Sequence, residues 1–239
     1  MKEYETIIGY HAAIAVLKNP LRKIISMKCT KEFFKKNKDL IGGKKISDFK
    51  IVNRKTIDLE CKNNFHQGVI INSSFLKNHN LNSISSDEKN IIILDSLNDS
   101  QNVGAIIRTA YLFGIKTIIY NKDNSFEINP HLIKASSGAF EKIKLIEVTN
   151  INRIIEKLKD LDFWIVGLDI NSSGNLNSIP RDLKKVLIFG SEDRGIRSSV
   201  LKKCDFKSKI DLPNKEKFID SLNVSNSVAI VLYECTKNE

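Results

Sequence analysis

Long apolar runs are missing from this chain of 239 residues. A membrane-spanning helix needs about 20 consecutive apolar residues, and not even a run of about 18 occurs, so no membrane partner is expected. The N-terminus carries acidic residues early, and no small-residue cleavage site follows its first apolar run. It therefore does not resemble a signal peptide.

Cysteine is scarce and dispersed, with only four residues at positions 29, 61, 204 and 235. None of them forms a Cys-x-x-Cys pair, and none lies at metal-ligand spacing from the four histidines. This pattern favours a reduced, cytoplasmic protein and predicts no metal site.

Closely spaced glycines are also missing, since none of the eleven glycines lie two residues apart. The dinucleotide loop and the common methyltransferase loop both need that spacing, because it lets the backbone approach the ligand. Gly190 and Gly195 are spaced as in a phosphate loop, but Ile196 and Arg197 follow where Lys and Ser/Thr belong, and the acidic Glu192 lies inside. A nucleotide triphosphatase is therefore disfavoured.

Metalloprotease and nucleophile-elbow motifs are absent as well. Beyond residue 88 the single histidine, His131, follows Pro130 at a predicted helix start and is expected on the surface. No nucleophile–histidine pair is available in that part of the chain.

Basic residues are in excess, with 38 Lys and Arg against 28 Asp and Glu, which gives a net charge of +10. Residues 1–88 hold 16 basic and 9 acidic residues, whereas residues 89–239 hold 22 and 19. The N-terminal third thus carries +7 of the excess, which permits a nucleic-acid partner there.

The chain divides into a small α/β domain (1–76), a polar linker (77–88) rich in Asn and Ser, and a larger α/β domain (89–239). In the small domain we expect a helix around Ala12–Leu17, strands at 24–27, 49–52 and 69–71, and a Lys-rich helix at 31–40. In the larger domain the predicted strands are 91–94, 115–120, 143–148, 163–168 and 186–189. The predicted helices are 102–113, 130–137, 151–161, 197–203 and 223–235.

This alternation predicts a mostly parallel sheet covered on both faces, with a ligand site at the carboxyl ends of its strands. The loops at 95–104, 168–175, 189–197 and 210–223 are therefore the places for a site. Asn102 is a plausible N-cap, and Arg108 lies on another helix face; an ordinary capped helix with a surface arginine fits equally well. Ser221, Asn223 and Ser225 indicate either another capped helix or a bound ligand.

Three of these loops together resemble the motifs of the SpoU family of RNA ribose 2′-O-methyltransferases. The first is AsnValGlyAlaIleIleArg (102–108), the second is PheGlySerGluAspArgGly (189–195), and the third is SerLeuAsnValSer (221–225) after LeuPro (212–213). One departure lies before the third motif, where Pro213 and Ser221 are eight positions apart and no glycine intervenes.

The resemblance implies an α/β fold whose parallel sheet contains a trefoil knot (the SPOUT topology), and S-adenosyl-L-methionine (AdoMet) as the cofactor. It implies that Gly190, Leu212 and Leu222 bind the cofactor, and we expect Leu168 to line the same pocket.

The resemblance also implies that Asn102, Arg108, Glu192, Ser221 and Asn223 are the catalytic residues. An arginine general base would be chemically awkward, because a guanidinium resists deprotonation. Holding the target phosphate and stabilising the developing alkoxide is an equally compatible role for Arg108.

GlyTyrHisAla (9–12) and HisGlnGlyVal (66–69) resemble the ribosomal-protein-like RNA-binding domain of the branch that methylates a 23S rRNA guanosine. The implied partners are structured rRNA, rather than DNA, and a second copy of the chain. The helix 223–235 is a candidate dimer interface, although core packing explains its apolar residues equally well. Two alternatives stay open: a tRNA guanosine 2′-O-methyltransferase, and a non-catalytic RNA-binding protein of ribosome assembly.

Overall fold

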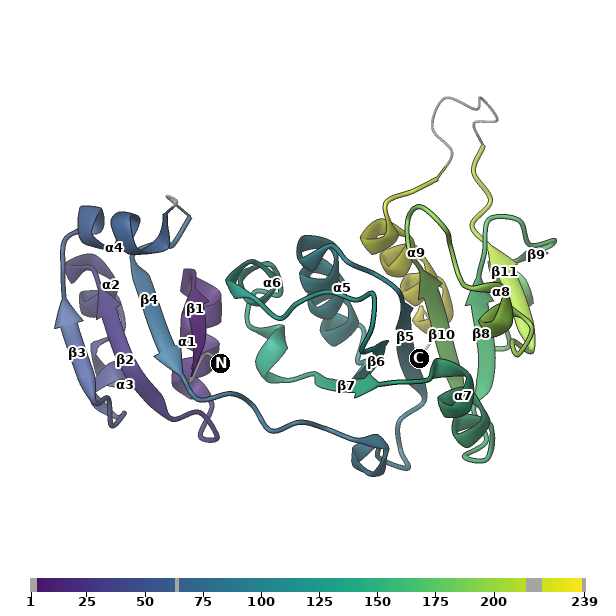
Figure 1. The fold of residues 1–239 in the computed structure, drawn as a ribbon, viewed down its shortest axis with the longest axis horizontal. Coiled ribbons are helices and arrows are strands. Elements are labelled where there is room, and N and C mark those ends of the chain that lie inside the picture. Colours follow the sequence, from purple (N-terminus) through teal and green to yellow (C-terminus); the bar gives the residue numbers. More distant parts are fainter. Residues whose placement is uncertain (1–3, 63–64, 214–220, 238–239) are drawn as a thin grey trace. The chain divides into compact units, whose positions relative to one another are not determined.

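The computed structural model describes residues 4–62, 65–213 and 221–237, which form two compact units (Figure 1). The smaller unit combines Met1–Lys77 with Ile128–Lys142, and the larger combines Asn78–Glu127 with Ile143–Glu239. The segment 128–142 therefore packs with the smaller unit, although it lies within the predicted domain 89–239. The chain crosses between the two units three times.

The smaller unit is built on a four-stranded sheet in the order β1-β4-β2-β3. Strand β4 pairs antiparallel with β1 and β2, while β2 pairs parallel with β3. The strands are β1 (Glu5–Ile8), β2 (Ile24–Cys29), β3 (Asp48–Ile51) and β4 (Val69–Ser73). The predicted small α/β domain is confirmed, but the sequence patterns did not predict β1.

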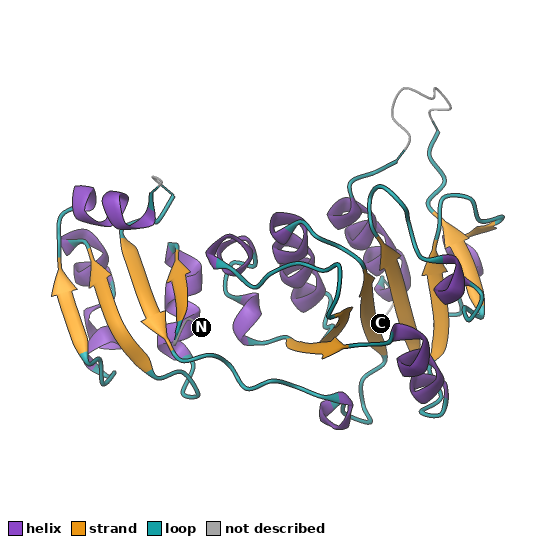
Figure 2. Ribbon diagram, in the orientation of Figure 1, coloured by secondary structure: helices purple, strands orange, loops and turns teal. Residues whose placement is uncertain are grey.

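The smaller unit also contains short helices beside this sheet (Figure 2). They are α1 (Tyr10–Lys18), α2 (Lys31–Lys36), α3 (Lys38–Gly42), α4 (Arg54–Cys61) and α6 (Pro130–Ala135). The helix predicted at 31–40 is split at Asn37, where the backbone leaves the helical region with φ −129°. His66 is fully buried, where its Nδ1 accepts from Gly68 N–H and its Nε2 lies 2.8 Å from Asp58 Oδ1.

The segment 128–142 is held in the smaller unit by buried polar contacts. Arg22 is almost fully buried and forms ion pairs with both Glu5 and Glu141; its Nη2 lies 2.7 Å from Glu141 Oε1. Asn19 Nδ2 donates to Glu141 Oε2 at 2.7 Å. Two carboxylates and the Ser74 carbonyl thus satisfy a guanidinium that would otherwise be costly to bury, and the Asn19 amide holds one of those carboxylates.

The larger unit is built on a seven-stranded, entirely parallel sheet in the order β7-β6-β5-β10-β8-β11-β9. Its strands are β5 (Asn90–Asp95), β6 (Thr117–Asn121), β7 (Lys144–Val148), β8 (Trp164–Leu168), β9 (Gly174–Asn175), β10 (Lys185–Gly190) and β11 (Phe206–Lys209). All five predicted strands are present within two residues of their predicted ends. Strand β10 lies between β5 and β8, so the loops that follow these three parallel strands begin side by side at the carboxyl edge of the sheet.

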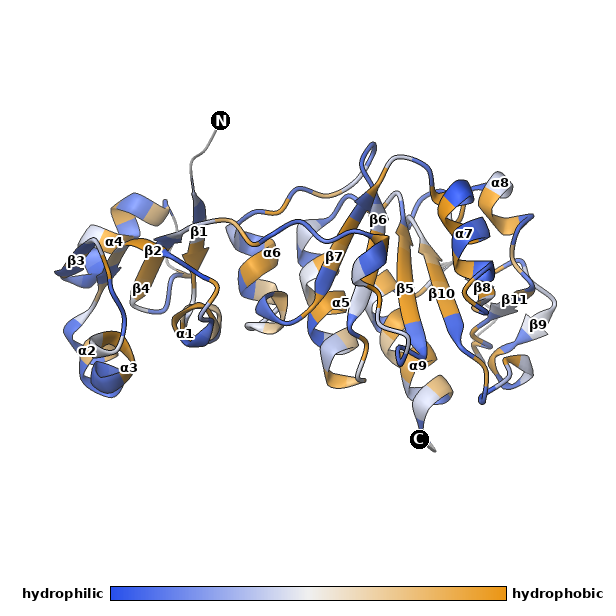
Figure 3. Ribbon diagram, turned by 90° about the horizontal axis from the view of Figure 1, so that it is seen from below, coloured by the Kyte–Doolittle hydropathy of each residue, from blue (hydrophilic) through white to orange (hydrophobic). Residues whose placement is uncertain are grey.

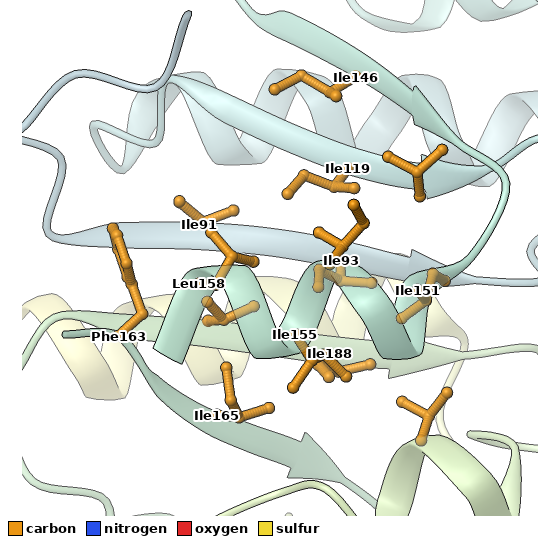
Figure 4. Close-up of a cluster of buried hydrophobic side chains, with 14 of the residues drawn as sticks. Ile91, Ile93, Ile119, Ile146, Ile151, Ile155, Leu158, Phe163, Ile165 and Ile188 are labelled. Atoms are coloured by element: carbon orange, nitrogen blue, oxygen red, sulfur yellow. The ribbon is translucent and has the colours of Figure 1, made fainter. Parts of the chain in front are cut away.

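Among the described residues, four helices cover this sheet: α5 (Ser100–Leu112), α7 (Ile151–Lys159), α8 (Ser198–Leu201) and α9 (Val224–Thr236). Helices α5 and α9 pack against each other, and α7 and α8 lie over the opposite face. Alternate residues of the buried strands enter the core beneath α7, as Ile91 and Ile93 do (Figure 4). The central strands are therefore apolar along almost their whole length, as expected for a sheet covered on both sides (Figure 3).

The predicted linker is partly folded onto the larger unit. It contains a short 3₁₀ turn, η1 (Leu81–Ser83), and Leu81 and Ile84 pack against the core beneath α7. Glu88 is buried and pairs with Lys144 at 2.8 Å. Across the described part of the chain, no helix combines the length and apolarity needed to cross a bilayer.

Candidate active site

A pocket of about 410 Å³ lies at the carboxyl ends of β8, β10 and β11. This is the edge of the sheet at which parallel α/β folds bind ligands, and the volume is typical of small-molecule sites. The loops after these strands and the residues leading into α9 line it. Its apolar lining residues include Leu168, Ile170, Phe189, Leu212, Leu222 and Val224.

All four residues predicted to bind the cofactor line this pocket, namely Leu168, Gly190, Leu212 and Leu222. Gly190 ends β10 where the following loop folds back over it. A Cβ at that position would lie 2.0 Å from the Gly195 carbonyl carbon and 2.2 Å from the Ile196 nitrogen. Only glycine therefore permits this loop to close beside the pocket.

Three of the predicted catalytic residues form one hydrogen-bonded cluster beside the pocket. The Glu192 carboxylate accepts from Asn102 Nδ2 and from Asn223 Nδ2, both at 3.0 Å, and from the Val224 backbone N–H at 3.3 Å. Asn223 Nδ2 also donates to Asn102 Oδ1 at 2.9 Å. The first, second and third motifs thus meet at this carboxylate, although 121 positions separate Asn102 from Asn223.

The prediction that Asn102 caps α5 is wrong. The N-cap is Asp99, whose side chain accepts from Gln101 N–H at 2.7 Å, so the helix begins at Ser100. Asn102 therefore lies in the first turn, and its amide is free to reach Glu192. Asn223, in contrast, does cap its helix, because its Oδ1 accepts from Ser225 N–H.

Two predicted catalytic residues lie outside this cluster. Ser221 lines the pocket and is exposed, and it directly follows residues 214–220, which lie outside the described part of the chain and include the departure from the third motif. Arg108 is exposed on α5, and no hydrogen bond or ion pair among the described residues holds its guanidinium. Six helical positions turn Arg108 about 120° away from Asn102 and move it about 9 Å along the axis.

The structure adds residues that the sequence patterns did not single out. Asp95 ends β5 and is fully buried, and it accepts from Arg197 Nε at 2.7 Å and from Arg197 N–H at 3.0 Å. This pair ties the end of the loop 190–197 to the neighbouring strand. An acidic residue directly after an apolar strand was the only local signal, and its partner lies 102 positions away.

Ser208 also lines the pocket and is fully buried, yet its hydroxyl has no hydrogen-bond partner among the described residues. Buried polar groups normally have partners, so this one indicates a place where a ligand can bond. Burial raises the pKa of Cys204, on the loop before β11, to about 11, which disfavours the reactive thiolate. The described residues contain no cluster of three His, Cys, Asp or Glu side chains suited to a metal ion.

The fold and the pocket define an α/β protein with a ligand site at the carboxyl edge of a parallel sheet. The chain belongs to the SpoU rRNA methylase family, whose model matches residues 89–233, so the family resemblance read from the three motifs is confirmed. It is therefore an RNA methyltransferase of the SpoU/TrmH type.

Two curated relatives cover different shares of the chain. An uncharacterized tRNA/rRNA methyltransferase of Borreliella burgdorferi is 35% identical over 83% of this chain and 92% of its own length. A putative TrmH family tRNA/rRNA methyltransferase of Staphylococcus epidermidis is 36% identical over 60% of this chain, and the match spans 57% of that protein.

Solved structures share the fold across both units. The SpoU methyltransferase AviRb from Streptomyces viridochromogenes, solved in complex with AdoMet, has a TM-score of 0.82 at 17% identity; the match covers 98% of this chain and 90% of AviRb. An AdoMet-bound rRNA methyltransferase from Sinorhizobium meliloti has a TM-score of 0.81 at 20% identity, covering 98% of this chain and 87% of that one.

Proposed function

We propose that this protein transfers a methyl group from AdoMet to a ribose 2′-hydroxyl of RNA, with a guanosine of 23S rRNA as its target. The observation that carries the proposal is the meeting of three distant segments at Glu192, directly beside a pocket at the carboxyl edge of the sheet. Segments that converge on one polar cluster beside a cavity are typical of an active site.

The pocket suits AdoMet in both size and chemistry. Leu168, Leu212 and Leu222 offer apolar surface for the adenine, and the buried hydroxyl of Ser208 offers a hydrogen bond. AdoMet would supply an electrophilic methyl group on its sulfonium. The protein then has to place the ribose hydroxyl in line with that methyl group, and orientation alone accounts for much of such a rate.

Arg108 is the residue assigned to the RNA. Its guanidinium binds a phosphate next to the target ribose and stabilises the developing alkoxide while the hydroxyl passes its proton to solvent water. Glu192 fixes the amides of Asn102 and Asn223, which orient the ribose and the loops around it. Ser221 stands at the mouth of the pocket and contacts the substrate.

A homodimer explains why Arg108 is remote from the cluster in its own subunit. Tyr111 and Leu112 are exposed on α5 at the third and fourth positions after Arg108, so the three side chains share one helix face. Ile230 and Tyr233 are exposed on α9, which packs against α5. A second copy seated on this apolar surface would receive Arg108 at its own pocket.

Transfer of labelled methyl groups from AdoMet to RNA tests the proposal. We expect transfer to 23S rRNA fragments, with the modified position mapped as a 2′-O-methyl ribose. Transfer to tRNA instead would support the tRNA-modifying alternative, and RNA binding without transfer would support the assembly protein.

The variant Arg108→Ala tests the assignment of roles within the site. It should abolish transfer and leave AdoMet affinity, measured by calorimetry, nearly unchanged, because Arg108 does not line the pocket. An equal loss of AdoMet affinity would contradict the role given to Arg108.

A further inference from the structure

A second hollow lies on the smaller unit, between α2, α3 and β3. Its volume is about 590 Å³, and it is open to solvent. Its lining combines four apolar side chains with three charged ones. The lining residues are Phe34, Lys38, Asp39, Ile41, Gly42, Lys44, Ile46 and Phe49.

Two phenyl rings stand at this hollow. The rings of Phe34 and Phe49 have their centroids 5.7 Å apart and are tilted by 41°. Ile41 lines the same hollow and is buried, whereas both rings stay partly exposed. Partly exposed aromatic faces in a concave site are the surfaces on which proteins stack unpaired nucleobases.

The segment that carries the two rings is rich in lysine, and two of its lysines, Lys38 and Lys44, line the hollow. Residues 31–50 contain seven lysines and three acidic residues. Lys36 pairs with Glu32, Lys50 pairs with Asp48, and Lys44 donates to a backbone carbonyl. Four further lysines are exposed and form no ion pair within the described chain: Lys31, Lys35, Lys38 and Lys45. Of these four, Lys38 lines the hollow, and the segment 31–50 as a whole has four more basic than acidic residues.

We propose that this hollow binds an unpaired nucleotide of RNA, with the base against Phe34 and Phe49 and the flanking phosphates on the lysines of α2 and α3. The rings together with the lysines favour a nucleotide over a lone phosphate group. A phosphate would need only the lysines, whereas a base needs the aromatic rings as well. The inference rests on the proposed function, in that it takes RNA as the substrate, and it assigns a holding site separate from the methyl-transfer pocket.

Salt-dependent binding of single-stranded RNA to the full chain, without AdoMet, tests the lysines. The probe is a fluorescein-labelled RNA of about 12 nucleotides of mixed sequence, read by anisotropy. The double variant Lys35→Glu/Lys38→Glu should bind more weakly, and the slope of log K against log salt should shrink by about 1.4, since each lost phosphate contact on a single strand removes about 0.7. The control Arg153→Glu/Lys157→Glu makes the same charge change on exposed positions of α7 and should leave the slope unchanged. Equal effects of both double variants would overturn the site.

The variant Phe49→Leu tests the stacking, because it keeps apolar volume and removes the ring. Affinity for the single strand should fall at least about fivefold, while affinity for the same RNA as a duplex stays unchanged. Thermal unfolding verifies that the variant folds. Unchanged single-strand affinity, or equally strong competition by polyglutamate, would overturn the nucleotide assignment. Methyl transfer is measured separately, so binding that responds as expected without any transfer refutes the proposed function alone.

Discussion

The role of the buried Ser208 hydroxyl can be tested by two measurements, the stability of the free protein and its affinity for AdoMet. This hydroxyl has no partner among the described residues and lines the pocket proposed for AdoMet. Ser208→Ala should leave the free protein at least as stable, because an unsatisfied buried polar group costs about 1–3 kcal/mol. AdoMet affinity should fall about 2- to 10-fold, since the lost bond is worth about 0.5–1.5 kcal/mol.

Ser136 supplies the matched control for that variant. It is also fully buried, but its hydroxyl donates to the Ile133 carbonyl at 2.6 Å. Ser136→Ala should therefore lower the free energy of unfolding by about 1 kcal/mol and leave AdoMet affinity unchanged. Calorimetry and urea unfolding measure both quantities. A Ser208→Ala protein that is less stable but binds AdoMet normally would show that the hydroxyl serves the fold.

At the scale of an element, the turn from β10 into the loop 190–197 depends on Gly190. The Cβ of Gly190→Ala would collide with the backbone of Gly195 and Ile196, atoms that no side-chain rotation can move away. The loop must open, so we expect a loss of at least about 1–3 kcal/mol in unfolding free energy and no measurable AdoMet binding.

Gly42→Ala provides the comparison, since a Cβ there meets nothing within 4 Å. Its stability should stay level or rise by up to about 1 kcal/mol, because alanine restricts the unfolded chain. If Gly190→Ala binds AdoMet as the wild type does, the tight closure of this loop is not required for the pocket.

Apolar runs explain which elements could be predicted from the sequence. Residues 91–94 are buried on both faces of the sheet, so they form a continuous apolar run that predicts β5. Strand β11 carries lysines at its second and fourth positions and resembles a loop, and β1 is only four residues long. These two segments become strands because they pair with segments far away in the sequence, and such pairing cannot be predicted from a local pattern.

The site residues also divide into those that sequence motifs predict and those that depend on distant contacts. The motifs predicted the residues that line the pocket and meet at Glu192, because the family resemblance carries their spacing. Asp95 and Ser208 were missed, since the partner of the Asp95 carboxylate lies far away in the sequence and the Ser208 hydroxyl has no partner among the described residues. The knotted path of the chain stays a prediction from the resemblance.

At the scale of the whole molecule, segment 128–142 joins β6 to β7 of the larger unit yet packs within the smaller one. Glu141 anchors it to the buried Arg22. Glu141→Ala leaves that guanidinium with Glu5 and the Ser74 carbonyl, and removing one partner of a buried pair costs about 3–5 kcal/mol. Urea unfolding should show this loss, whereas Glu127→Ala, at an exposed position just before the segment, should change stability by less than about 0.5 kcal/mol. A loss no larger than that of the control would mean that the segment is only loosely held.

The proposed dimer makes the sharpest prediction about the assembled molecule, because each site would combine one subunit's Glu192 with the other subunit's Arg108. Arg108→Ala and Glu192→Ala homodimers should both be inactive. A heterodimer of the two, purified through two different tags, keeps one intact site and should recover about half of the wild-type turnover per dimer, since a two-fold dimer has two equivalent sites. Sites built within a single subunit would each lack one residue, so an inactive heterodimer would place Arg108 in its own subunit's site. Light scattering that finds a monomer at assay concentration would rule out the shared site altogether.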